Sequence, residues 1–476
     1  MKNKSAWLKY NNKDIQNLEK YSNDYMAFIS NCKTERECAK FAINAASKKG
    51  YKTLEEVIKI EKSLSPGDKV MAQIHGKSVM LIHVGQQPLE KGMNIIGAHI
   101  DSPRLDIKQN PLYESSDICF MDTHYYGGIK NYQWVAIPLA LHGVVVKKDG
   151  KVVDINIGED SADPVFCISD LLPHLGTEQM AKTANKVIEG EDLDLIFGNR
   201  PNKSKENAVK ANLLSLLNKK YKIQEEDFLS AELEVVPAGA ARTMGLDESM
   251  ILGYGHDDRV CSFAAMHAQF ALPKIPNKTA VCLLVDKEEI GSVGATGMTS
   301  KFFENTIAEI IALGCSSASS TSANTGSKKA EKTCSSIILR RCLAASNMLS
   351  ADVNAAFDPT YASVYEAKNS CYLGRGLVFT KFTGSRGKAM SNDASAEFMA
   401  QLRNIMEEAN VSFQTSELGR VNAGGGGTIA FILAEYTMNV IDAGVGVLSM
   451  HAPWEVCSKA DIFEMAKGFK AFYENA

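Results

Sequence analysis

The chain has 476 residues, of which 45% are hydrophobic and 23% are charged, and its formal net charge is −4. A slightly acidic balance excludes electrostatic attraction to nucleic acid or to an anionic membrane as the main mode of partner binding. The sequence contains no run of about 18 apolar residues, so no transmembrane helix is predicted. A secretory signal requires an apolar segment after the first lysines, and none follows them here.

The predicted elements begin with helices. Apolar residues recur at helical spacing from about residue 12 to residue 60, with interruptions near Lys33 and Gly50. Short apolar runs follow, and helical patterns at 260–270 and 394–409 separate several of them. The runs are 79–84, 93–98, 135–146, 281–285, 307–313, 336–339, 377–382 and 438–447. Apolar strands that alternate with helices predict an α/β fold whose sheet is covered on both faces.

The stretch between Leu105 and Gly253 has a different pattern. It contains strands rich in Tyr and Val at 132–146 and 151–157, a helical segment near 171–183 and a polar, basic stretch at 199–210. Because a chain of 476 residues is too long for a single hydrophobic core, we interpret this stretch as an inserted second domain. The expected division is 1–105 and 254–476 for the main domain and 106–253 for the insertion. The low-complexity segment 315–332 predicts a mobile surface loop.

The eleven cysteines do not follow a metal-binding or disulfide pattern. None of them forms a Cys-x-x-Cys pair, and their number is odd. Scattered, reduced thiols are typical of a reducing compartment, so we expect the protein in the cytoplasm.

Five short segments place a His, Asp or Glu at or near the end of an apolar run, where binding sites of α/β sheets are built. The first is GAHIDSP, residues 97–103. Its His-x-Asp pattern allows His99 to bind a metal through one ring nitrogen while Asp101 orients the ring through the other. Taken alone, the triplet fits a surface or core-capping histidine equally well.

The second segment, GHDDR, leads into the predicted helix at 260–270. The carboxylate of Asp257 can bridge two metal ions about 3.5–4 Å apart, as in two-metal hydrolases. An aspartate that caps the helix N-terminus is the simpler explanation for this segment by itself.

The third segment, VDKEEIGS at 285–292, is the most informative. Two adjacent glutamates, Glu288 and Glu289, repel each other at the end of a buried strand unless a cation is present. A metal ion removes the conflict, with one glutamate as ligand and the other as base for the bound water. A solvated acidic turn is the alternative.

The last two segments contribute single candidates, Asp352 in LSADVN and His451 in VLSMHAPW. A lone histidine or aspartate is more often structural than a ligand. Together, however, the five segments supply two histidines and several carboxylates. This set of nitrogen and oxygen donors favours a cocatalytic zinc site over a structural one, which would use cysteine.

The segments GAHIDSPRLDIK, GYGHDDRVCSF, DKEEIGSVGATG, SADVNAAFDPTY and SMHAPWEV occur in the order and at the spacings of the aspartyl aminopeptidase family of zinc metallopeptidases. The chain resembles this family over nearly its whole length. The resemblance implies an α/β/α, phosphorylase/hydrolase-like catalytic domain with an inserted β-rich oligomerisation domain. It also implies a metalloaminopeptidase that releases N-terminal amino acids from peptides and assembles as a homo-oligomer, expected to be a tetrahedral dodecamer.

The resemblance further implies two Zn²⁺ ions per subunit, and Co²⁺ or Mn²⁺ can substitute at such nitrogen and oxygen donors. His99 and Asp352 resemble the ligands of one zinc ion, and Glu289 and His451 those of the other. Asp257 matches the aspartate that bridges the two ions.

Two acidic residues match catalytic roles in the family. Glu288 matches the general base, which takes a proton from the metal-bound water and delivers it to the leaving amine. Zinc lowers the pKa of that water toward about 7. Asp101 matches the aspartate that orients a histidine ligand.

Further residues match the family's substrate site. His174, in LLPHLG, resembles a histidine that reaches the active site of a neighbouring subunit and contacts either substrate or metal, although a buried histidine satisfied within its own domain is the alternative. Lys381 and a run of four glycines that includes Gly425 and Gly426 match the substrate pocket. Aspartate-selective members carry a histidine where this chain has Ala355, so the resemblance supports the hydrolysis chemistry rather than a preference for acidic residues.

Two other functions use the same residues. A di-metal amidase or deacylase acting on N-acyl amino acids needs the same ligands. A catalytically silent shell or scaffold protein would be marked by the loss of a ligand, and every ligand position is filled here.

Overall fold

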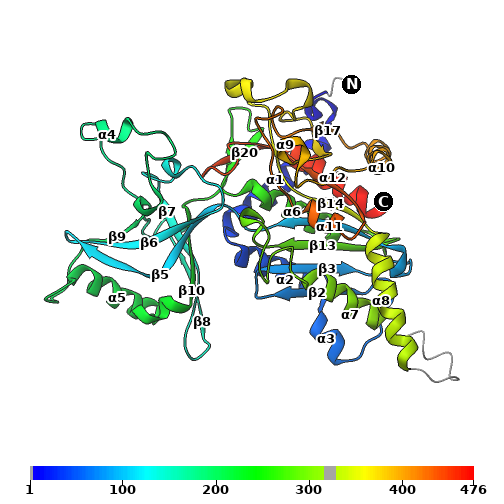
Figure 1. The fold of residues 1–476 in the computed structure, drawn as a ribbon, viewed down its shortest axis with the longest axis horizontal. Coiled ribbons are helices and arrows are strands. Elements are labelled where there is room, and N and C mark those ends of the chain that lie inside the picture. The colour runs from blue at the N-terminus through cyan, green and yellow to red at the C-terminus, as the bar shows by residue number, and fades with distance from the viewer. Residues whose placement is uncertain (1–3, 316–327) are drawn as a thin grey trace. The chain divides into compact units, whose positions relative to one another are not determined.

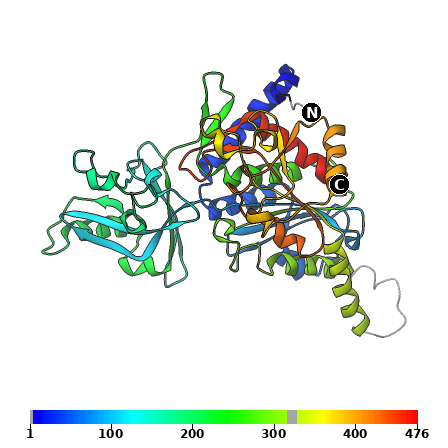
Figure 2. The same ribbon diagram turned by 45° about the horizontal axis from the view of Figure 1, so that its top comes forward.

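The computed structural model describes residues 4–315 and 328–476, which divide into two compact units (Figures 1 and 2). Unit 1 comprises Met1–Asp101, Arg242–Met450 and Glu455–Ala476. Unit 2 comprises Ser102–Ala241 together with the short segment His451–Trp454. For comparison with unit 2, the inserted domain predicted from the sequence spans residues 106–253.

Three helices open unit 1: α1 (Asn12–Asn31), α2 (Glu35–Lys48) and α3 (Leu54–Lys59). Each begins at a capping box, in which the side chain of Asn11, Thr34 or Thr53 accepts a backbone N–H from an acidic residue three positions later. That acidic side chain in turn accepts the N–H of the capping residue, so two otherwise unpaired donors are satisfied. The helical prediction and its two interruptions are confirmed.

The central element of unit 1 is a nine-stranded sheet with the order β1-β2-β3-β13-β4-β14-β18-β16-β17. Strands β13, β4, β14 and β18 are parallel neighbours, whereas β3 and β16 run antiparallel beside them. The bounds are β1 (Lys52–Thr53), β2 (Lys69–Ile74), β3 (Ser78–His83), β4 (Met93–His99), β13 (Thr279–Val285), β14 (Asn347–Ser350), β16 (Leu377–Thr380), β17 (Phe413–Ser416) and β18 (Asn439–Gly444).

Helices cover both faces of this sheet, so the predicted α/β class is confirmed (Figure 1). One face packs against α6 (His256–Phe270) and α12 (Lys459–Asn475). On the other face, alternate strand residues such as Ile95, Val281 and Leu283 join side chains of α7 (Phe302–Cys315), α8 (Lys328–Ala344) and α11 (Ala430–Ala434) in one apolar core. A further helix, α10 (Ala396–Glu408), occupies the predicted helical pattern at 394–409.

Two predictions in this region are wrong. The apolar runs 307–313 and 336–339 are not strands but parts of α7 and α8. A short apolar run fits a buried strand and a buried helix equally well, and only its continuation over 14 or 17 helical residues separates the two. The predicted loop at 315–332 falls mostly on residues 316–327, outside the described residues, and its last part is helical from Lys328 onward.

A five-stranded sheet completes unit 1, with the order β11-β12-β20-β19-β15. A one-turn helix, α9 (Ser385–Lys388), follows β16. The strand bounds are β11 (Arg242–Met244), β12 (Met250–Gly253), β15 (Asn354–Ala355), β19 (Gly446–Leu448) and β20 (Glu455–Ser458).

Unit 2 is built on a six-stranded antiparallel sheet with the order β8-β7-β10-β5-β6-β9. The bounds are β5 (Arg104–Ser115), β6 (Ile118–Tyr126), β7 (Leu139–Val146), β8 (Val152–Ile157), β9 (Leu195–Gly198) and β10 (Ala231–Pro237). Helix α5 (Ala208–Tyr221) packs against β5 and β6. The helix predicted at 171–183 is wrong, because only one turn, α4 (Thr177–Met180), is helical there.

In the described part of the chain, no helix is both long and apolar enough to span a membrane.

Candidate metal centre

The sheet of unit 1 explains why distant segments meet. Strands β13, β4 and β14 are parallel neighbours, so their carboxyl ends lie at one edge of the sheet. His99 is the last residue of β4 and pairs with Val285, the last residue of β13. Glu288 begins a 3₁₀ turn just after β13, and Asp352 lies two residues after β14.

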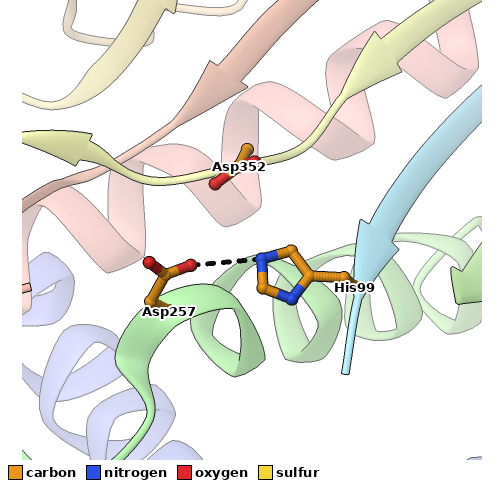
Figure 3. Close-up of side chains that lie close together, drawn as sticks. All are labelled: His99, Asp257 and Asp352. Carbon is orange, nitrogen blue, oxygen red and sulfur yellow. Dashed lines mark hydrogen bonds and ion pairs between the residues drawn. The ribbon is translucent and has the colours of Figure 1, made fainter. Parts of the chain in front are cut away.

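Three predicted ligands form one group in unit 1: His99, Asp257 and Asp352 (Figure 3). One potential donor atom from each lies within 4.8 Å of the other two. Nε2 of His99 is 3.1 Å from Oδ1 of Asp257. Asp257 reaches this place from the start of α6, where its peptide bond to Asp258 is cis. The three side chains thus come from the end of β4, the start of α6 and the segment after β14.

Asp101 holds both the histidine and the two glutamates. Nδ1 of His99 lies 3.0 Å from the backbone oxygen of Asp101 and 3.3 Å from its Oδ1. The same carboxylate accepts the backbone N–H groups of Glu288 and Glu289, each at 3.2 Å. With Nδ1 engaged by Asp101, Nε2 faces Asp257 and Glu288, whose Oε2 is 3.9 Å away. This is the arrangement in which a carboxylate orients a metal-binding imidazole.

The group carries an excess of negative charge. Burial alone lowers the pKa of His99, but its hydrogen bonds to Asp101 and Asp257 outweigh this effect and raise the pKa well above its ordinary value. Burial raises the pKa of Asp352, and the nearby carboxylates of Asp258 and Glu288 raise it further. Several carboxylates therefore crowd one imidazole in a region of low exposure.

A zinc ion fits these residues. The donors are one imidazole nitrogen and carboxylate oxygens, which are ligands that Zn²⁺ accepts. A divalent cation among them offsets the mutual repulsion of Asp257, Asp258 and Asp352, and the ring of His99 is already oriented by its other nitrogen.

The other predicted ligands divide between the two units. Glu289 lies in unit 1 directly after Glu288, whereas His451 belongs to the segment assigned to unit 2. Within unit 2, Nδ1 of His451 is 2.9 Å from the backbone oxygen of Gly128. A hydrogen bond from Nδ1 to this carbonyl leaves Nε2 as the nitrogen that can bind a metal, as Asp101 does for His99.

The predicted substrate residues of unit 1 lie on two loops that contact each other. Lys381 follows β16 and forms an ion pair with Asp393. The backbone N–H of Gly426 donates to the backbone oxygen of Thr383 at 3.0 Å. Gly425 has a φ of +137°, and a Cβ added to it would lie 2.6 Å from Cα of Ser385. Only glycine fits that position, because both the conformation and the space exclude a side chain.

His174 is exposed, so the alternative of a buried histidine is wrong. It lies in a turn of unit 2 between Leu172 and Leu175, which are 49% and 69% exposed. Two exposed leucines beside it are typical of a surface that another molecule covers. Its contact with substrate or metal stays a prediction. Ala355, at the end of β15, offers no polar side chain to a substrate.

Three residues near the predicted ligands were not identified from the sequence. Asp258 is fully buried beside Asp257, and Glu455 accepts the backbone N–H of Asp257 at 3.1 Å. Asp258 lies in the motif GHDDR and Glu455 in the motif SMHAPWEV, so their place in these motifs could have identified them as site residues. Gly128 acts through its backbone carbonyl, and no side-chain pattern can indicate such a role.

Comparison with known proteins identifies the family to which the chain belongs. The chain matches the family described as aminopeptidase I zinc metalloprotease (M18) over residues 28–473. A Clostridium acetobutylicum protein named "Probable M18 family aminopeptidase 1" is 53% identical over 474 residues, which cover 99% of this chain and 98% of that protein. The crystal structure of an M18 family aminopeptidase from Thermotoga maritima is 40% identical, with a TM-score of 0.91 and full coverage of both chains. A solved dodecamer of mApe1 from S. cerevisiae has a TM-score of 0.74 at 20% identity, covers 96% of this chain and 97% of that one, and shares the fold. The chain therefore belongs to the M18 family of zinc aminopeptidases.

Proposed function

We propose that this aminopeptidase uses two zinc ions per chain. His99 and Asp352 hold one ion, Glu289 and His451 hold the other, and Asp257 bridges them. The donor set and the two oriented histidines support this assignment. Zinc bound there would polarise the scissile carbonyl and lower the pKa of a bound water molecule. Because all donors are nitrogen or oxygen, Co²⁺ or Mn²⁺ should substitute.

Glu288 is the proposed general base. The observation that carries this role is the position of Asp101, whose carboxylate holds the ring of His99 and the backbone of Glu288 and Glu289 at the same time. A ligand and the base are therefore fixed by one anchor, which gives the preorganisation that proton transfer requires. Glu288 takes a proton from the attacking water and returns it to the leaving amine. Asp101 serves as the positioning residue.

The substrate is a peptide with a free N-terminus. The acidic residues of the site attract its cationic α-amine, which explains selection for N-terminal residues. Lys381, Gly425 and Gly426 are proposed to line the pocket for the N-terminal side chain. His174 is proposed to enter the site of a neighbouring subunit, where its imidazole donates a hydrogen bond to the scissile carbonyl oxygen.

The proposed assembly is a homo-oligomer, a tetrahedral dodecamer formed through unit 2. The exposed leucines beside His174 support a covered surface there. A cytoplasmic location is proposed from the thiols: nine cysteines of the described residues are free, and eight of these are buried.

A substrate comparison tests the proposed chemistry. We expect hydrolysis of aminoacyl p-nitroanilides with a free α-amine and little or none of their N-acetylated counterparts, because acetylation removes the charge that the acidic site attracts. Initial rates over a panel of N-terminal residues measure this, and the panel also reports whether acidic residues are preferred in the presence of Ala355. Faster hydrolysis of the N-acetylated compounds would favour a deacylase instead.

A further inference from the structure

Unit 2 contains a cleft of about 900 Å³ that the assignments above do not use. Its walls are formed by residues 125–132, which comprise the end of β6 and the loop that follows it, and by the loop at residues 184–190. The lining includes Tyr125, Gly128, Lys130, Tyr132, Asn185 and Lys186. Binding sites for small ligands typically occupy about 300–1,000 Å³, so the cleft has the size of a site for a short peptide.

The two walls are held together by specific contacts. Nδ2 of Asn131 donates to the backbone oxygen of Ile188 at 3.1 Å. On the opposite loop, Gly190 lies against the ring of Tyr125, since a Cβ added to this glycine would be 3.4 Å from the ring. Gly127 turns the first loop with a φ of +76°, a conformation that favours glycine. The cleft is therefore a built feature of unit 2.

The cleft borders a proposed metal ligand within the same unit. Gly128 lines the cleft, and its carbonyl oxygen is the group that lies 2.9 Å from Nδ1 of His451. A molecule bound in the cleft is thus next to the loop that orients His451. With His451 as a zinc ligand, as proposed, the cleft lies beside one residue of the site that cleaves the peptide bond.

The lining has the chemistry of a site for a peptide with a free carboxylate. Lys130 and Lys186 are exposed cations, and Tyr125 and Tyr132 are 46% and 41% exposed, which leaves their rings available to side chains. Among the described residues that line the cleft, Glu189 is the one acidic side chain, and its ion pair with Lys182 at 3.6 Å offsets its charge. The net charge of the cleft is therefore positive.

We infer that this cleft binds the part of the peptide that follows the scissile bond, with Lys130 and Lys186 at the C-terminal carboxylate and the two tyrosines beside the side chains. The inference rests on the proposed function, since it takes His451 as a zinc ligand. Extended chain advances roughly 3.3 Å per residue, so the two leaving residues of a tripeptide span roughly 7 Å. Two or three residues after the scissile bond suit a cleft of this size.

Three matched substrates test the inference: a tripeptide with a free C-terminal carboxylate, its C-terminal amide, and the aminoacyl p-nitroanilide of the same N-terminal residue. For Lys130→Ala and Lys186→Ala, the ratio of kcat/KM for the acid to that for the amide should fall about fivefold each, the size expected of an exposed charge pair. Lys130→Glu should lower the ratio further, because it repels the carboxylate. The change should lie in KM rather than in kcat.

Lys148→Ala is the matched control, because Lys148 is an exposed lysine of unit 2 that pairs with Glu226 at 3.0 Å and is absent from the cleft lining. It should leave the ratio at the wild-type value. The same ratio is measured as Kd by calorimetry in the Glu288→Gln background, so the inference is tested even if turnover fails. Absence of turnover of all three substrates by the wild type would refute the proposed function alone.

The inference would be overturned if the lysine variants kept the wild-type acid-to-amide ratio both in kcat/KM and in Kd. Equal losses for all three substrates with a smaller particle in sedimentation would also overturn it, because that outcome makes the cleft a contact between copies of the chain.

Discussion

Glu288→Gln should lower kcat by about 10²–10⁴ while the zinc content stays near that of the wild type. A carboxamide has the size of the carboxylate but cannot accept the proton of the attacking water. The backbone N–H of residue 288 still donates to Asp101, so the turn after β13 should keep its position. Steady-state kinetics and elemental analysis of the same preparations measure the two effects.

Glu289→Gln is the matched control for this experiment. It changes the adjacent residue in the same way, and its backbone N–H is held by the same carboxylate. Because Glu289 is a proposed ligand, this variant should lose zinc, and added zinc should restore part of its activity. Equal metal loss in both variants, or an active Glu288→Gln protein, would contradict the assigned roles.

His174→Ala should lose about 10²–10³ in kcat while its fold, particle size and zinc content persist. The expected loss is that of one hydrogen-bond donor to the oxygen that becomes negative in the transition state. The exposure of His174 means that the substitution leaves no cavity in unit 2. Kinetics, sedimentation and elemental analysis together separate loss of the donor from loss of the assembly.

Subunit mixing tests whether His174 acts on a neighbour. Under conditions that exchange subunits, His174→Ala and Glu288→Gln proteins should together regain activity, because one chain supplies the base and the other the histidine. Normal kinetics of His174→Ala would refute the role. Failure of rescue despite proven exchange would place the histidine in the site of its own chain.

Local patterns predicted much of the fold. Apolar residues at helical spacing between about residue 12 and residue 60 became α1, α2 and α3, and continuous apolar runs at 93–98 and 281–285 became β4 and β13. The runs at 307–313 and 336–339 failed because a short apolar run has no clear period. The helix near 171–183 failed because its apolar residues, such as Leu172 and Leu175, are exposed in the chain and do not face a core.

The candidate site was predictable where side chains carry it. His99, Asp257 and Asp352 come together because strand ends and one helix start meet at a single sheet edge. Gly128 was not predictable, since a backbone carbonyl has the same chemistry at every residue. Lys130 and Lys186 were not predictable either, because the loops that bring them together are fixed by the contact of Asn131 with Ile188.

Zinc titration of chelated protein tests the two-zinc site most directly. Protein dialysed against a chelator and shown by elemental analysis to be metal-free should be inactive. Activity should return as zinc is added and reach its maximum at two bound ions per chain, because one ion alone leaves either the His99–Asp352 or the Glu289–His451 donors unused. His99→Ala and His451→Ala should each bind about one ion fewer. Full activity in the metal-free protein, or a maximum at one ion with no loss of binding in either histidine variant, would contradict the account.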